Sequence, residues 1–226
     1  MANVGAQQVK ALRDRTGAGM MDCKNALLES GGDEEKAVEI IQKKGLAKAA
    51  KKAGAIAAEG VIHSYIHAGS RLGVLVEVNC QTDFVARNEE FKRFVDEVGL
   101  QIASSAPRYV RRAEIPAADL TAQDAIFRGQ LDEEAKKTGK AKPEAALAKI
   151  VEGKLNKWFT ETCLEEQALV TREDDKTVGQ VSEELTAKLG EKIAVRRFVR
   201  FELGEGIEVA KKDLAADVAE TLAKGG

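Results

Sequence analysis

The sequence contains few of the residues that build disulfides, metal sites and stacking platforms for bases. Its 226 residues include three cysteines, two histidines and three prolines, and aromatic residues make up only 4%. Cys23, Cys80 and Cys163 are far apart and form no Cys-x-x-Cys pair, which fits neither a disulfide framework nor a zinc site and indicates a reducing compartment. His63 and His67 lie two residues apart without a third ligand nearby, so we expect no metal site and no cofactor.

The chain also lacks an excess of charge and any long apolar run. Lysine and arginine number 35 against 37 aspartates and glutamates, which argues against a nucleic-acid or membrane-surface protein. No apolar run approaches the roughly 20 residues that span a bilayer, and residues 1–10 contain no apolar block typical of a secretory signal. With 44% hydrophobic residues, we expect a soluble chain of one or two small domains, each with a real core.

The first sixty residues are predicted to be mainly helical. Apolar positions recur at helical spacing in residues 7–15, 21–30 and 34–44, which predicts a three-helix domain over residues 1–45 with Gly45 as a C-cap. Residues 46–60 are rich in Ala and Lys and are predicted to form a connecting helix. Met20 and Met21 begin the second helix, and because adjacent helical positions cannot both face inward, we expect at least one exposed thioether. The alternative is that Met20 folds back and packs against the preceding loop.

Residues 61–208 are predicted to form an antiparallel α+β core. Period-2 alternation predicts three strands over residues 61–67, 72–81 and 193–203. One face of the second strand carries Leu72, Val74, Val76, Val78 and Cys80. One face of the third is predicted to carry Ile193, Val195, Val199, Phe201 and Leu203, with Arg197 as the exception, and the other face Arg196, Phe198 and Arg200.

Helices are predicted to group around these strands. Asn88 can cap a helix whose apolar stripe continues to Ile102, and residues 177–189 form a second amphipathic helix. Two further helices are predicted to make a hairpin at about 119–157, either as a projecting arm or as an ordinary packed pair. A last helix is predicted within a C-terminal module over residues 209–226.

A short turn joins the second strand to the helix at Asn88. It consists of Thr82, Asp83, Phe84 and Val85, a kind of place where side chains are presented to a partner. Spacing alone nevertheless favours a Phe84 that is tucked under its own domain, because a phenylalanine in a tight turn is more often buried than offered outward.

Two stretches resemble the signatures of the elongation factor Ts family, the exchange factors that strip GDP from the GTPase elongation factor Tu. The first runs from Leu12 to Leu27 and contains Arg13-Asp14-Arg15-Thr16-Gly17-Ala18-Gly19-Met20-Met21-Asp22-Cys23-Lys24. The second is Glu77-Val78-Asn79-Cys80-Gln81-Thr82-Asp83-Phe84-Val85-Ala86-Arg87. Lys176-Thr177-Val178-Gly179-Gln180 and the stretch from Phe201 to Glu208 are similar to the family's last helix start and last strand end, so the resemblance covers nearly the whole chain.

The resemblance implies a fold, a function and a place of action. It implies an N-terminal domain similar to a ubiquitin-associated three-helix module, a coiled-coil arm at the helical hairpin, and a C-terminal module that touches the partner. The implied function is guanine-nucleotide exchange in translation elongation, in which the chain disrupts the Mg²⁺ and phosphate site of elongation factor Tu without being an enzyme. A short member such as this one is expected in the cytoplasm, or alternatively in the chloroplast stroma or mitochondrial matrix.

The resemblance also implies which residues contact the partner. Arg13, Met20 and Met21 match residues that contact the GTPase domain, and His67 matches a residue at the partner surface. Phe84 is expected to wedge between helices of the GTPase while Asp83 fixes or repels local groups, with Thr82 and Val85 beside them. Longer members resemble two sheet-bearing halves, whereas this chain has one sheet unit, so we expect a homodimer with paired sheets in a two-plus-two complex.

Two other functions would use parts of this sequence. An RNA-binding accessory protein of translation would use the lysine-rich helix with Arg196, Arg197 and Arg200, although balanced charge and sparse aromatics weigh against it. A thiol enzyme would use Cys80, which falls on a predicted buried face where a cysteine is usually inert. No G-x-x-x-x-G-K-[ST] loop occurs, so we do not expect the chain itself to bind the nucleotide.

Overall fold

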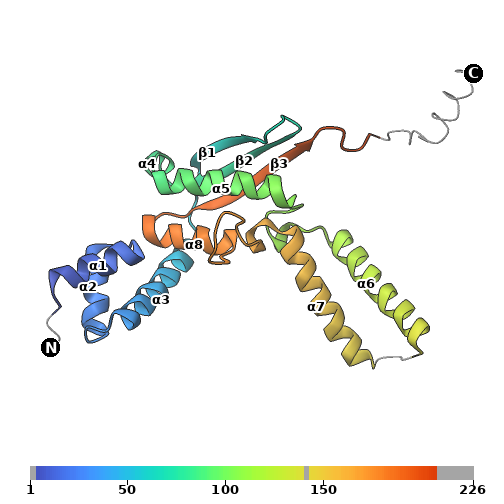
Figure 1. Cartoon of the computed structure of the whole chain (residues 1–226), viewed down its shortest axis with the longest axis horizontal. Coiled ribbons are helices and arrows are strands. Elements are labelled where there is room, and N and C mark those ends of the chain that lie inside the picture. The colour runs from blue at the N-terminus through green and yellow to red at the C-terminus, as the bar shows by residue number, and fades with distance from the viewer. Residues whose placement is uncertain (1–3, 140–142, 208–226) are drawn as a thin grey trace, which may run out of the picture.

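Three helices form the N-terminal end of the molecule, shown in blue in Figure 1. The computed structural model describes residues 4–139 and 143–207, and its first elements are α1 (Ala6–Thr16), α2 (Met20–Glu29) and α3 (Glu34–Lys52). The side chain of Asp33 caps α3 by accepting a hydrogen bond from the backbone N–H of Lys36 at 3.1 Å. A small core, made of Val9, Leu12, Cys23, Ala26, Leu27 and Ala37, holds the three together. The predicted N-terminal helices are therefore confirmed.

Helix α3 does not end at Gly45, where the sequence predicted a C-cap. It continues through the Ala- and Lys-rich stretch to Lys52, so the predicted third helix and most of the predicted connecting helix are one element. The glycine instead permits a close crossing with α8 (Val178–Leu189). A Cβ built at Gly45 would lie 3.3 Å from the Cβ of Ala187 on α8, which is tighter than ordinary contact.

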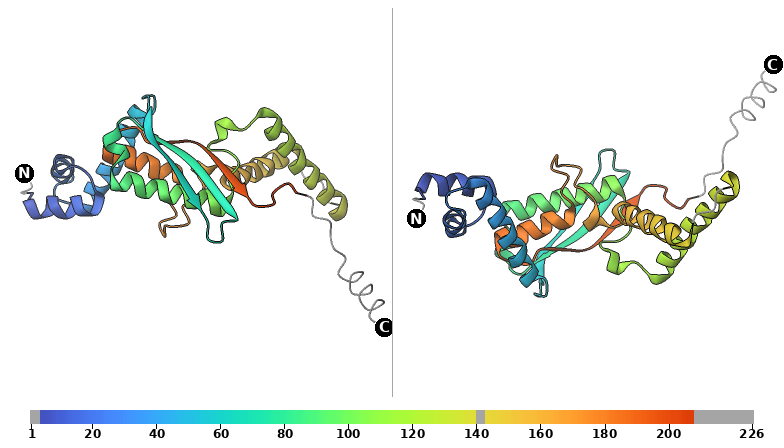
Figure 2. Two further views of the ribbon diagram at one scale, coloured as in Figure 1. Left: turned by 90° about the horizontal axis from the view of Figure 1, so that it is seen from above. Right: turned by 90° about the horizontal axis from the view of Figure 1, so that it is seen from below.

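The core contains the predicted antiparallel sheet, with strand order β1-β2-β3. Its strands are β1 (Glu59–Ile66), β2 (Leu72–Cys80) and β3 (Ala194–Glu202). Helix α5 (Glu89–Ser105) and α8 lie beneath the sheet, and the left view of Figure 2 shows the strands uppermost with their outer face open. The alternate residues of β2 point into the core as predicted, because Val74, Val76, Val78 and Cys80 are all buried. The predicted mixed α+β architecture is confirmed.

A β-bulge in β3 overturns the predicted face of that strand. Opposite β2, Glu77 pairs with Arg197 and Val78 with Val195, so Arg196 is an extra residue. An extra residue changes the phase of the alternation, which moves every later side chain to the other face. Val195 and Phe198 consequently pack on the core, whereas the other face carries Val199 and Phe201, which are 48% and 69% exposed.

The remaining helices form a hairpin that leaves the core. Helices α6 (Ala117–Thr138) and α7 (Glu144–Thr162) lie side by side in Figure 1, and each buries a residue, Leu131 and Val151 respectively. Short 3₁₀ helices, η1 (Arg112–Glu114) and η2 (Leu164–Glu166), lie at the base of this hairpin, where Trp158 is 9% exposed. The predicted C-terminal module, residues 209–226, lies outside the described residues. Among the helices that the structure describes, none is long and apolar enough to cross a membrane.

Candidate partner-binding site

The turn after β2 is a helix of one turn, α4 (Asp83–Ala86), rather than an irregular turn. Thr82 caps it, since its hydroxyl accepts a hydrogen bond from the backbone N–H of Val85 at 3.5 Å. Asn88 caps the next helix, as the sequence predicted, by accepting from the N–H groups of Glu90 and Phe91. Two caps separated by six residues therefore fix a small helical tip between the sheet and α5.

Phe84 points out of this tip. Its side chain is 79% exposed, whereas Ala86 is buried and Val85 packs against the core. The expectation from spacing that Phe84 is tucked under its own domain is therefore wrong. The physical reason is the one-turn helix, which places Val85 and Ala86 on its inner side and Phe84 on its outer side. Asp83 lies beside Phe84 and forms an ion pair with Arg87 at 2.8 Å.

Glu191, on the turn after α8, holds the start of the tip. One carboxylate oxygen accepts hydrogen bonds from the backbone N–H groups of Gln81 and Thr82 at 3.2 and 2.9 Å. The other accepts from the hydroxyl of Thr82 at 2.7 Å. The thiol of Cys80 donates to the carbonyl of Thr82 at 3.1 Å, and the side-chain oxygen of Gln81 accepts from the N–H of Lys192 at 3.1 Å. Sequence reasoning missed Glu191, because it is 109 residues from Thr82 and no local pattern joins them.

The N-terminal helices present a second exposed apolar group at the same end of the molecule. Met20 and Met21 are 61% and 66% exposed, and Arg13 is exposed on α1. Figure 1 shows α1, α2 and α4 at one end of the molecule, away from the α6–α7 hairpin. Both methionines are outward, so the minimum of one exposed thioether expected from the sequence is exceeded.

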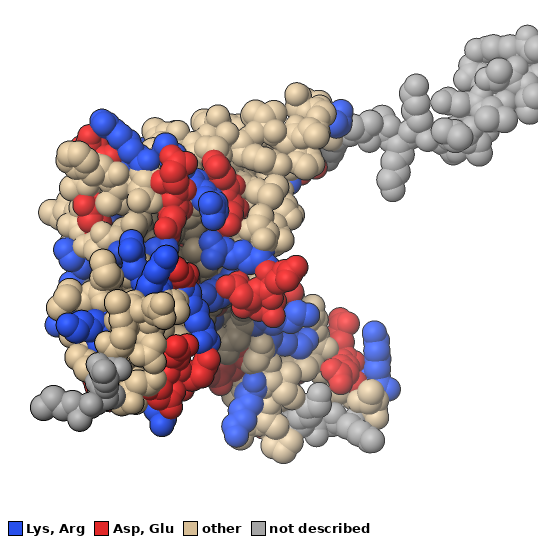
Figure 3. Space-filling view, turned by 60° about the vertical axis from the view of Figure 1, so that its left-hand side comes forward, with Lys and Arg blue, Asp and Glu red and all other residues tan. Residues whose placement is uncertain are grey.

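A cleft of about 1180 Å³ separates the N-terminal helices from α5 and α8. Its lining includes Lys51 and Lys52 on α3, Arg93 on α5 and Lys188 on α8. Figure 3 looks toward this end of the molecule and shows basic side chains gathered between its upper and lower parts. Asp22, Glu90 and Glu184 also line the cleft, so its cations outnumber its carboxylates without being the only charges there.

His67 does not join this group. It follows β1 in the hairpin loop, and β1 pairs with β2 so that Ile66 faces Gly73 while Glu59 faces Cys80 beside the tip. The length of β2 thus separates His67 from Phe84, about 27 Å for nine residues of extended chain. The Nδ1 atom of His67 lies 2.9 Å from the hydroxyl of Tyr65. The predicted contact residues therefore occupy two separate regions of the surface.

The residues that a thiol enzyme or an RNA-binding protein would use form contacts within the chain itself. Burial raises the pKa of Cys80 to about 11, with the charge of Glu191 adding to the effect, so the thiol is protonated and unsuited to act as a nucleophile. Arg196 and Arg197 both bind the carboxylate of Glu77, at 2.8 and 2.6 Å, so part of the positive charge considered for RNA binding is compensated within the chain. Within the described residues, no three His, Cys, Asp or Glu side chains are placed to hold a metal ion.

Comparison with known proteins places the chain in a family. The profile of the family described as Elongation factor TS matches residues 20–205. The chain is 54% identical to the protein named Elongation factor Ts of Desulforamulus reducens and 54% identical to that of Myxococcus xanthus, each over 98% of this chain and 99% of the relative. It is 52% identical to that of Geobacter metallireducens over 96% of this chain and 97% of the relative. The family match and these full-length similarities together show that the chain belongs to the elongation factor Ts family.

Proposed function

We propose that the chain promotes GDP release from elongation factor Tu, the exchange activity of its family, by engaging the GTPase at two places at once. The observation that carries this proposal is the exposure of three large apolar side chains at one end of the molecule. Phe84 projects from α4 and Met20 and Met21 from α2, each more than 60% exposed. Exposed groups of this kind are typical anchors of a protein interface.

The binding energy needed for nucleotide exchange requires contacts both at Phe84 and at the two methionines of α2. Accelerating release ten-thousand-fold requires about 5.5 kcal/mol of preference for the nucleotide-free partner over the nucleotide-bound one. Burying Phe84 supplies about 1.5 to 3 kcal/mol. Each methionine, already partly covered in the free chain, supplies about 1 to 2 kcal/mol. The tip alone therefore falls short, whereas the tip and α2 together approach the required amount.

The tip is suited to act as a wedge in the partner. Phe84 stands on a helix fixed at both ends, so that it can enter a gap between helices of the GTPase without folding back on its own domain. Bound Mg²⁺ joins the nucleotide phosphates to the GTPase, and displacing the segments that hold it removes much of the nucleotide's affinity. Asp83 would bring a carboxylate near that site. Thr82 and Val85 serve mainly to hold the tip, and Arg13 adds a cation beside α2.

The experiment is release of a fluorescent GDP from elongation factor Tu by wild type, Phe84→Ala and the control Val170→Ala. Val170 is also an exposed apolar residue, at 54%, on the segment before α8. We expect Phe84→Ala to lower the release rate at saturation by about tenfold or more, the value of an aromatic anchor, and Val170→Ala to leave it unchanged. Equal rates for Phe84→Ala and wild type would reject the wedge.

We also propose that two copies pair through the outer face of the sheet. That face carries Ile62, Ile66, Leu75, Val199 and Phe201, all at least 46% exposed. Ile66 lies against Gly73, because a Cβ added there would be 3.0 Å from its Cδ1 atom, so this part of the face is flat and apolar. Two such faces pack about 10 Å apart in a sheet sandwich, and a two-fold axis makes one patch complementary to itself.

Sedimentation tests the dimer. We expect wild type to sediment at twice the mass of the chain and Val199→Asp to sediment as a monomer with an unchanged circular dichroism spectrum. Ile126→Asp is the control, since Ile126 is also about half exposed but lies on α6. A monomeric wild type at micromolar concentration would reject this pairing.

Finer features of the family are extended to this chain as proposals. The three N-terminal helices are proposed to form a ubiquitin-associated-like domain. Helices α6 and α7 are proposed to form a coiled-coil arm, in which Arg128 of α6 forms an ion pair with Glu144 of α7 at 3.4 Å. The division at residues 45, 60 and 208 remains a prediction from the sequence pattern, although α3 continues through residue 45. The partner contact of His67 remains a prediction from the resemblance. Because its relatives are bacterial, we infer that the chain acts in a bacterial cytoplasm.

A further inference from the structure

We propose that Glu191 is a positioning residue for nucleotide exchange, which fixes the Phe84 tip to the same end of α8 that carries the N-terminal helices. The inference rests on the proposed function, because it concerns how the two contact regions are held relative to each other. Glu191 itself does not need to touch the partner.

The first step is the attachment of the tip. The carboxylate of Glu191 accepts three hydrogen bonds, from the N–H groups of Gln81 and Thr82 and from the Thr82 hydroxyl, at 2.7 to 3.2 Å. A charged acceptor makes each of these bonds stronger than a neutral one would. Thr82 is also the residue that caps α4. Glu191 therefore holds the residue from which the helix bearing Phe84 begins.

The second step is the attachment of the N-terminal helices, a few residues earlier on α8. Ala187 meets Gly45 of α3, and the side chain of Lys188 lies against Gly17, where an added Cβ would come within 2.5 Å of its Cε and Nζ atoms. The ammonium group of Lys188 is 2.6 Å from the carboxylate of Glu90 on α5. Gly17 opens the loop that leads to Met20. The end of α8 together with the turn that follows it, residues 187–192, thus contacts the supports of both regions.

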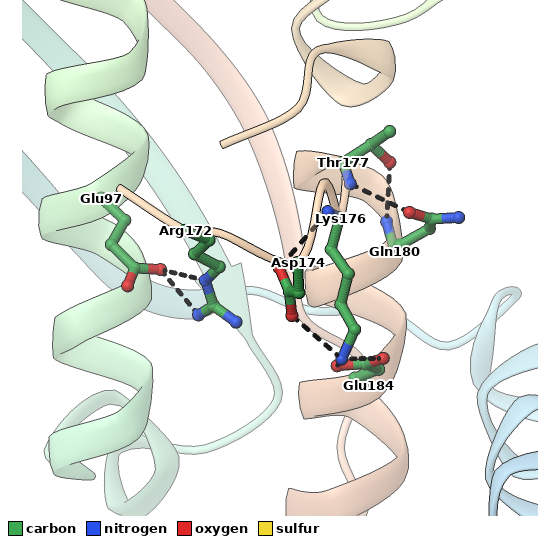
Figure 4. A network of polar contacts seen from close by, with 7 residues as sticks. All are labelled: Glu97, Arg172, Asp174, Lys176, Thr177, Gln180 and Glu184. Carbon is green, nitrogen blue, oxygen red and sulfur yellow. Dashed lines mark hydrogen bonds and ion pairs between the residues drawn. The ribbon is translucent and has the colours of Figure 1, made fainter. Parts of the chain in front are cut away.

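The third step is the rigidity of α8 itself. Figure 4 shows the polar contacts at its start, where Thr177 and Gln180 form a capping box. Lys176 binds Asp174 and Glu184 at 3.4 and 2.8 Å, and Arg172 binds Glu97 of α5 at 2.7 Å. Val178, Val181 and Leu185 are buried in the core. A helix anchored along its length can serve as a common reference for the two regions.

Without the carboxylate, the tip loses its connection to that reference. The N–H groups of Gln81 and Thr82 would lose their acceptor, and the Thr82 hydroxyl would be free to rotate away from its capping position. A one-turn helix has too few internal hydrogen bonds to keep its shape alone. Phe84 would then sample several directions, and the partner's binding energy would order the tip instead of opening the nucleotide site.

Three variants test the proposal: Glu191→Ala, Glu191→Gln and the control Glu183→Ala, which removes an exposed carboxylate from another part of α8. We expect Glu191→Ala to lower the saturated release rate of fluorescent GDP about tenfold, the effect of losing hydrogen bonds to a charged acceptor. Gln keeps an acceptor at one oxygen only and should fall between, at about threefold. Hydrogen exchange should show faster exchange of the Gln81 and Thr82 amides in Glu191→Ala, while thermal unfolding shows that the core remains folded.

The double variant Phe84→Ala/Glu191→Ala separates positioning from a general structural role. If Glu191 acts through Phe84, its removal should change the release rate by less than about twofold once Phe84 is absent. Additive losses would overturn the proposal, as would a Glu191→Ala protein that is folded and releases GDP like wild type. If Phe84→Ala alone has no effect, the wedge itself fails and the inference fails with it. If Phe84→Ala is impaired and Glu191→Ala is not, only the positioning role is wrong.

Discussion

Replacing Gly45 with leucine should shift the N-terminal helices on α8 and weaken partner binding while leaving the wedge intact. A Cβ at this position already lies 3.3 Å from Ala187, so Gly45→Ala requires a shift of a few tenths of an ångström. Alanine also raises helix propensity by about 1 kcal/mol, which offsets that strain. Leucine adds three more carbons to a crossing without room for them, and overpacking of this kind costs about 1 to 3 kcal/mol or separates the helices.

The effect on exchange follows from what α3 carries. If α3 moves away from α8, Met20 and Met21 no longer keep their position relative to Phe84, and the partner can engage only one region at a time. Losing one methionine contact of about 1 to 2 kcal/mol corresponds to about five- to thirtyfold in affinity. In a titration of fluorescent-GDP release, the half-saturating concentration of Gly45→Leu should rise about tenfold, and the rate at saturation should fall as well, because α2 then no longer adds its share of the preference for the nucleotide-free partner.

The control is Gly129→Leu, because Gly129 is also inside a helix but no atom would lie within 4 Å of an added Cβ. It should behave as wild type in the same titration. A Gly45→Leu protein that melts cooperatively and has the half-saturating concentration of Gly45→Ala would refute the reasoning, because the crossing would then have no influence on how the partner is held.

Three further predictions concern titratable groups. Burial raises the pKa of Cys80 to about 11, so iodoacetamide at pH 8 should modify it in the folded chain at least about a hundredfold more slowly than in urea; rapid modification of the native thiol would contradict this. Burial raises the pKa of Glu165, so its contribution to the free energy of unfolding is fully present below the ordinary pKa and declines as pH rises through the folded pKa. Urea unfolding should therefore show Glu165→Gln gaining stability relative to wild type as pH rises above the ordinary glutamate pKa. Hydrogen bonds from Arg196 and, to a smaller extent, Arg197 lower the pKa of Glu77 to about 2. The contribution of Glu77 to the free energy of unfolding is therefore present above about pH 4.5 and lost as pH falls toward 2. In Glu77→Gln, the free energy of unfolding should depend less steeply on pH over this acidic range.

The sequence predicted those parts of the fold that depend on neighbouring residues. Period-2 alternation located β2, and Asp33, Asn88 and Thr177 each cap the helix that was expected to follow. Alternation failed in β3, because a bulge at Arg196 changes its phase. Arg197 was the one charged residue in the predicted apolar face, and this exception was a local sign of the bulge. A bulge shifts the alternation and so keeps a charged side chain out of the core.

Features that depend on distant residues could not be predicted in this way. Gly45 has the local pattern of a C-cap, but α3 continues through it to Lys52, and the neighbour that leaves no room for a side chain there is Ala187, which is distant in the sequence. Phe84 in a short turn is more often buried, and its outward direction follows from a one-turn helix whose inner side packs on the core and whose capping residue, Thr82, is held by the distant Glu191. In the candidate site, the resemblance to the family identified Phe84 as an outward-facing residue. Glu191, which holds the tip that carries Phe84, was identified only from the structure.

An exchange factor needs a rigid tip, because a flexible tip would change its own conformation on binding instead of changing the conformation of the GTPase. Binding energy can distort the GTPase only if the tip resists being distorted by a similar amount. The tip has this resistance because the Glu191 carboxylate fixes its start, the Asn88 cap fixes its end, and buried Ala86 fixes its inner side. The same reasoning applies to the distance between Phe84 and Met20, since two contacts that share one rigid support act together, whereas two on a loose support act nearly independently. In the arrangement that we propose, both supports lie on the end of α8 and the turn after it, so Phe84 and Met20 would act on the partner together rather than independently.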